Sequence, residues 1–129
     1  MVDNISVNTE VTTFYIENNI LYSIYKEGVD VNIENIEKNI IARKKMQKGE
    51  KYPTLVDVRK VWQFSDEARK LAGGDDVSGM STAIAVVTGY SMPIRMVANF
   101  FMKFNRPTIP TQLFKTKKRA LAWLDTFKD

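Results

Sequence analysis

The chain has 129 residues, of which 44% are hydrophobic and 26% are charged, and its formal net charge is +4. This composition is typical of one soluble globular domain. Cysteine and histidine are both absent, which excludes disulfides, cysteine nucleophiles, serine–histidine relays and zinc sites built from these side chains. We therefore expect a protein that is not an enzyme and that needs no metal ion or other cofactor.

The beginning of the chain is polar, and no apolar run is long enough to cross a bilayer. Together with the lack of cysteine, this favours a cytoplasmic protein that is not transmembrane. Residues 1–10 have no hydrophobic period and are expected to form a flexible lead-in. Residues 11–129 contain no internal repeat or linker, so we expect a single domain there.

The first part of the domain predicts an antiparallel hairpin. Two segments rich in β-branched and aromatic residues, Val11–Ile16 and Ile20–Tyr25, flank Asn18-Asn19. Asparagine tolerates the positive φ that a two-residue hairpin turn requires. Strand alternation then gives two faces, one with Phe14, Ile16 and Leu21 and the other with Tyr15, Tyr22 and Ile24.

The rest of the chain alternates between helices and strands. In order, the expected elements are a helix over Ile33–Met46, a strand over Tyr52–Val58, a helix from Ser65 to about Ala72, a strand over Thr82–Thr88, a helix over Ser91–Phe104, a strand over Ile109–Phe114 and a helix over Thr116–Phe127. A loop over Gly73–Gly79 separates two of them. The order ββαβαβαβα predicts an α/β fold with a mostly parallel five-stranded sheet and an N-terminal antiparallel hairpin.

The predicted helix over Ser91–Phe104 carries more apolar surface than packing on one sheet requires. It is either well buried or in contact with another protein or a second copy of the chain. We expect the interaction surface to comprise Tyr15, Tyr22, Val97, Phe101 and Met102.

The predicted last helix opens with Lys117, Lys118 and Arg119, where positive charge opposes the helix dipole. These residues either keep the surface soluble or help to bind an anion with backbone N–H groups. Because ligands of open α/β sheets bind at the carboxyl ends of the strands, the candidate anion site comprises Ser91, Arg95, Lys115, Thr116, Lys117, Lys118 and Arg119.

Other polar groups have simpler interpretations. Asp57 beside Arg59 indicates a structural ion pair rather than a catalytic acid. The run Gly73-Gly74-Asp75-Asp76 matches no calcium or phosphate loop. Basic and aromatic residues are interleaved, but no recognition motif for nucleic acid is present, so we do not expect nucleic acid as a partner.

Three strings carry a resemblance to a known fold: residues 51–59 followed by 65–69, residues 89–104, and residues 110–124. They resemble a bacterial family of uncharacterised small proteins with the fold of STAS domains, the sporulation anti-sigma-factor antagonists, and of CRAL-TRIO lipid-binding domains. The resemblance covers about residues 11–127. It implies a superhelix of βα units that is non-enzymatic and acts through protein contacts.

The resemblance also concerns a phosphorylation switch. Phosphorylated STAS antagonists have a Ser after an Asp at the start of the helix that follows the third strand. This chain has Asp66 at that Ser position, with Glu67-Ala68 in place of the usual Ser-Gly. Ser65, directly before Asp66, is the candidate phospho-acceptor, although capping of the helix is the simpler explanation for it.

Two functions follow as hypotheses. The first is a STAS-like interaction module that pairs with itself, as a homodimer, or with a regulatory protein. The alternative is a small binding domain for an anionic or lipid-like ligand at the carboxyl ends of the strands.

Overall fold

The computed structural model describes residues 6–91, 93–95 and 109–128. The strands are β1 (Ser6–Asn8), β2 (Thr12–Glu17), β3 (Ile20–Tyr25), β4 (Asp30–Val31), β5 (Tyr52–Asp57), β6 (Gln63–Phe64), β7 (Ser81–Val87) and β8 (Thr111–Phe114). The helices are α1 (Ile33–Gln47), α2 (Asp66–Ala72), α3 (Asp75–Ser78) and α5 (Lys117–Asp125), and residues 93–95 are helical. In these ranges, no helix has the length and apolar character needed to cross a membrane.

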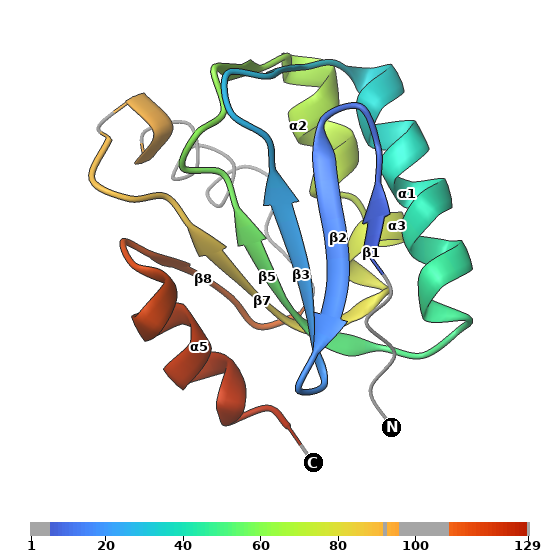
Figure 1. Ribbon diagram of the computed structural model, residues 1–129, viewed down its shortest axis with the longest axis vertical. Helices are drawn as coiled ribbons and strands as arrows, with labels where there is room; N and C mark the ends of the chain where they lie inside the picture. The colour runs from blue at the N-terminus through green and yellow to red at the C-terminus, as the bar shows by residue number, and fades with distance from the viewer. Residues whose placement is uncertain (1–5, 92, 96–108, 129) are drawn as a thin grey trace.

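A six-stranded sheet in the order β1-β2-β3-β5-β7-β8 forms the centre of the fold. The first three strands are antiparallel, and β3, β5, β7 and β8 are parallel. Helix α5 lies on one face of the sheet, and α1, α2 and α3 lie on the other (Figure 1). The predicted mostly parallel sheet with an antiparallel N-terminal hairpin is therefore confirmed, with one strand more than expected.

The extra strand is β1, which lies in the expected flexible lead-in. Val7 pairs with Phe14 of β2, and Ser6 pairs with Tyr15. The lead-in prediction is wrong for residues 6–8, because backbone pairing with β2 orders a polar segment that has no hydrophobic alternation. Two further elements were not predicted: the short parallel pair of β4 with β6, and α3, a single helical turn inside the expected loop over Gly73–Gly79.

The hairpin between β2 and β3 has the predicted turn. Asn18 and Asn19 have φ of 56° and 63°, as a two-residue turn with two left-handed positions requires. Tyr15 pairs with Tyr22, so the predicted assignment of side chains to the two faces is confirmed.

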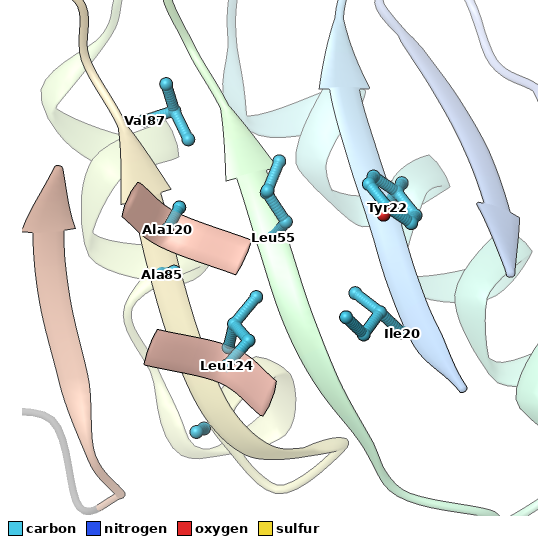
Figure 2. Close-up of a cluster of buried hydrophobic side chains, with 8 residues drawn as sticks. Ile20, Tyr22, Leu55, Ala85, Val87, Ala120 and Leu124 are labelled. Atoms are coloured by element: carbon cyan, nitrogen blue, oxygen red, sulfur yellow. The ribbon is translucent and has the colours of Figure 1, made fainter. Parts of the chain in front are cut away.

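The face toward α5 is closely packed. Leu55, Ala85 and Val87 from the sheet have no exposed surface, and neither do Ala120 and Leu124 from α5. Figure 2 shows these side chains between the central strands and α5. Alanines at the contact let the helix approach closely, so this short helix can cover the middle of the sheet.

The opposite face has a second apolar cluster around α1 and α2. It includes Val31, Ile36 and Ala68, all nearly or fully buried. Helix α1 begins with a capping box, in which Asn32 and Asn35 each accept a hydrogen bond from the other's backbone N–H. The cap fixes where the helix starts and so sets which of its side chains meet the sheet.

Replacing Asn19 should change stability through the turn alone, because its side chain is exposed. Asn19→Gly should raise the free energy of unfolding by a few tenths of a kcal/mol, since glycine adopts positive φ without strain. Asn19→Val should lower it by about 1–2 kcal/mol. Urea denaturation of both variants measures the effect, and equal stabilities would contradict a left-handed turn at this position.

Candidate functional site

The carboxyl ends of the parallel strands gather at one edge of the sheet. In Figure 1 the arrowheads of β3, β5 and β7 point toward this edge, where the helical turn at 93–95 also lies. We call the loops of this edge the strand-end surface; it comprises residues 57–65, 88–91, 93–95 and 115–116. Most residues of the predicted anion site fall on it or beside it.

Asp57, at the end of β5, is held by Arg59. The Arg59 Nη2–Asp57 Oδ2 distance is 2.7 Å, and Arg59 Nε donates to both carboxylate oxygens at 3.0 and 3.1 Å. The backbone N–H of Arg59 donates to Asp57 Oδ1 at 3.0 Å. This hydrogen bonding raises the pKa of Arg59. The predicted structural ion pair is confirmed, and both oxygens of this buried carboxylate are engaged.

Arg59 also connects the loop after β5 with the loop after β7. Gly89 has a φ of +68°, and a Cβ built there would lie 3.3 Å from Arg59 Cγ. The absence of a side chain at residue 89 therefore lets the stem of Arg59 pack across the neighbouring loop. The position requires glycine for both conformation and space.

Ser65 caps α2, as the sequence predicts. Its Oγ accepts a hydrogen bond from the backbone N–H of Ala68 at 3.1 Å. The adjacent Asp66, which the resemblance to phosphorylated STAS antagonists aligns with their Ser, is exposed and forms an ion pair with Arg69. The capping role is confirmed, and phosphorylation of Ser65 stays a prediction.

The ends of β7 and β8 bring three predicted anion-site residues together. Arg95 Nη1 donates to Thr88 Oγ1 at 3.1 Å, and Ser91 Oγ accepts from the backbone N–H of Ile94 at 3.5 Å. The Lys115 ammonium lies 5.3 Å from the centre of the Tyr90 ring. These cations already have local partners at the surface.

The remaining cations of the predicted site lie on α5. Thr116 caps this helix by accepting from the backbone N–H of Arg119 at 3.3 Å, and Lys118 is exposed. Lys117 turns to the sheet, where its Nζ lies 5.3 Å from the centre of the Tyr22 ring. Ser91, Arg95 and Lys115 thus have partners in the loops after β7 and β8, whereas Lys117 contacts Tyr22. A shared anion site of the seven residues stays a prediction.

The predicted contact surface also changes. Tyr15 and Tyr22 stack with ring centroids 4.5 Å apart and an interplanar angle of 9°. Tyr22 is only 5% exposed because it belongs to the cluster under α5, and burial raises the pKa of its hydroxyl. Tyr22 is therefore a core residue, whereas Val97, Phe101 and Met102 lie outside the residues that the structure describes.

Two exposed aromatic side chains were not predicted as site residues. Trp62 is 75% exposed and Tyr90 is 72% exposed, and both lie on the strand-end surface. Ile41 of α1, at 55%, is the other large hydrophobic residue exposed in the described ranges. Residue 62 lies in an irregular loop without periodicity, so only the exposure itself could have identified it.

The comparisons with known proteins agree with this architecture. A family profile described as "Domain of unknown function (DUF7793)" matches residues 14–128. No curated protein matches the chain. An uncharacterised protein of the DUF3478 family with a SpoIIAA-like fold, from Shewanella loihica PV-4, is similar in structure, with a TM-score of 0.65 at 20% identity over 96% of this chain and 98% of that chain.

Two further solved structures share the fold. One is a candidate anti-sigma factor antagonist from Thermotoga maritima, with a TM-score of 0.62 at 13% identity over 87% of this chain and 92% of that one. The other is an anti-sigma factor antagonist from Mycobacterium paratuberculosis, with a TM-score of 0.57 at 12% identity over 88% and 92%. The predicted STAS-like fold is confirmed.

Gly89→Ala should destabilise the protein more than Gly28→Ala. Both glycines have positive φ, but a Cβ at residue 28 meets nothing within 4 Å. Gly28→Ala should lower the free energy of unfolding by about 1 kcal/mol, and Gly89→Ala by about 2 kcal/mol or more because Arg59 is also displaced. Urea denaturation measures both losses. When Arg59→Ala is the parent protein, Gly89→Ala should lower the free energy of unfolding by only about 1 kcal/mol. Equal losses in the two single variants would argue against the contact.

Proposed function

We propose that this chain, which belongs to the DUF7793 family of domains of unknown function, is a non-enzymatic regulatory module that binds a protein partner. The observation that carries the proposal is the exposure of Trp62 and Tyr90 on the strand-end surface. Tryptophan and tyrosine dominate the binding energy of protein interfaces when a partner buries them. The names of two structural neighbours, a candidate anti-sigma factor antagonist and an anti-sigma factor antagonist, support the same class of function.

The charges around these aromatic residues favour an acidic partner. Lys60 and Lys115 are exposed beside them, and the Arg59 side chain retains 42% exposure although it pairs with Asp57. Such a basic rim would steer an acidic surface toward the two aromatic side chains and discriminate against basic partners.

The non-enzymatic part of the proposal rests on how the polar groups of the strand-end surface are used. Asp57, the buried carboxylate there, is committed to Arg59, and the hydroxyl of Ser65 is committed to a helix cap. Neither has a histidine as a base, since the sequence contains none. Within the described ranges, no three acidic side chains are grouped to hold a metal ion.

Trp62→Ala and Tyr90→Ala should each weaken partner binding at least tenfold, which is the effect of removing an interface anchor. The test immobilises the full chain, captures proteins from the organism that encodes it, and measures the affinity of each recombinant candidate by calorimetry. Ile41→Ala is the matched control, because Ile41 is an exposed hydrophobic residue on α1, away from this surface. A partner that binds all variants equally would contradict the proposed surface.

Self-association through the segment over Ser91–Phe104 is proposed from its apolar sequence alone. The chain should then behave as a dimer in light scattering at tens of micromolar, and Phe101→Asp should convert it to a monomer, because a buried charge at an interface is costly. If the unmodified chain is a monomer, self-association is contradicted, but the proposed partner surface around Trp62 and Tyr90 is not.

A further inference from the structure

A cavity of about 420 Å³ lies on the α1 and α2 side of the sheet. This volume is within the range of small-molecule sites, roughly 300–1,000 Å³. Most of its wall is apolar, with Val56, Ile84 and Val86 from the sheet and Ile36 and Ile40 from α1. Its described lining includes none of the cations of Lys115–Arg119, so it is separate from the predicted anion site.

The polar wall of the cavity contains Arg43 of α1, which is only 4% exposed. Arg43 Nε donates to Gln47 Oε1 at 3.0 Å. Its Nη2 donates to Thr54 Oγ1 at 3.4 Å and to Ser81 Oγ at 3.2 Å. The guanidinium therefore reaches from α1 to the beginnings of β5 and β7.

Ser81 reaches this position because of an irregularity in the sheet. Strand alternation would put it on the same face as Ala83, toward α5. The register between β5 and β7 shifts at Tyr52/Pro53, and Ser81 Oγ lies 2.7 Å from Thr54 Oγ1 on the α1 side. A bulge re-aims a side chain in this way, so the local backbone supports the polar wall.

All acceptors that Arg43 contacts are neutral. A guanidinium has five N–H donors. The Arg43 side chain donates only through Nε and Nη2, so its Nη1 donates to no side chain or carbonyl in the described ranges. No buried side-chain nitrogen there lacks a partner, so Nη1 is not sealed within protein and is open to the cavity. No carboxylate in the same ranges forms an ion pair with Arg43.

A buried cation without an anion is costly, and proteins normally pair such a charge. Burial lowers the pKa of Arg43 to about 10, so the group is still charged at neutral pH. The described wall of the cavity contains no acidic residue, and its other arginine, Arg69, forms an ion pair with Asp66. The missing negative charge would therefore have to come from a molecule that enters the cavity.

We propose that this cavity binds an anionic amphiphile, an acyl-chain carboxylate, with its carboxylate on Arg43 Nη1 and its chain along Val56, Ile84 and Val86. A bare anion would leave these apolar walls without contacts, and a neutral hydrocarbon would leave the guanidinium without an anion. An acyl carboxylate satisfies both halves of the cavity. This inference does not depend on the protein-partner function.

The test compares ligands that share a chain but differ in charge. Isothermal titration of the full chain with decanoate should show one saturable site, and decanol and inorganic phosphate should each bind at least tenfold more weakly. In Trp123→Phe, Trp62 is the only tryptophan and lies in the cavity wall. Its emission should change on titration with decanoate, which locates the ligand.

Two variants test separately the contribution of the Arg43 charge and that of the cavity volume. Arg43→Met and Val86→Phe should each weaken decanoate binding tenfold or more, the first by removing the cation and the second by filling the cavity. Lys118→Met, which removes an exposed cation on the opposite side of the sheet, should bind as the unmodified chain does. Circular dichroism checks that each variant folds. If Arg43→Met does not fold, the affinity of Val86→Phe for decanoate and the comparison of decanoate with decanol still test the proposal.

Three outcomes would overturn the proposal. Equal affinities for decanol and decanoate would leave Arg43 without a role. Unchanged decanoate affinity in folded Arg43→Met or Val86→Phe would place the ligand elsewhere. No saturable binding of hexanoate, decanoate or laurate would show that the cavity takes no acyl carboxylate.

Discussion

The central strands β5 and β7 are paired on both sides, so their side chains must be covered above and below the sheet. The two faces meet this requirement differently. Toward α5, Leu55, Ala83 and Ala85 have no exposed surface. On the other face, Val56 and Val86 are only partly buried, and a cavity remains. The close packing between the sheet and α5 makes the sheet rigid, so the face toward α1 and α2 can keep a cavity.

The open face depends on Arg43 for its connection between helix and sheet. Its guanidinium contacts Gln47 within α1 and hydroxyl groups of both β5 and β7, while Gln47 Nε2 donates to the carbonyls of Glu50 and Met80. Such a network holds α1 in register with two strands at once. Because its acceptors are neutral, the same interaction that orders the fold also leaves a positive charge at the cavity wall.

Much of the fold could be predicted from local signals. The Asn18-Asn19 turn, the cap at Ser65 and the apolar strands each depend on a few neighbouring residues, and the structure has them. Strand β1 could not be predicted, because this segment forms a strand only by pairing with β2. The site was harder for the same reason: the burial of Tyr22 under α5 arises only from tertiary packing. In the sequence, Arg43 likewise looks like an ordinary basic residue near a helix end, and nothing there indicates that it is buried.

Strand β1 has a consequence for how the molecule behaves among its own copies. A sheet that ended at β2 would offer six residues of unpaired backbone, Thr12–Glu17, as a template for strands of other molecules. With β1 in place, the outermost strand on this side has three residues within the described part of the chain, which is too short to bind another chain strongly. Pairing of Ser6–Asn8 with β2 thus covers backbone groups that could otherwise bind the strands of other molecules.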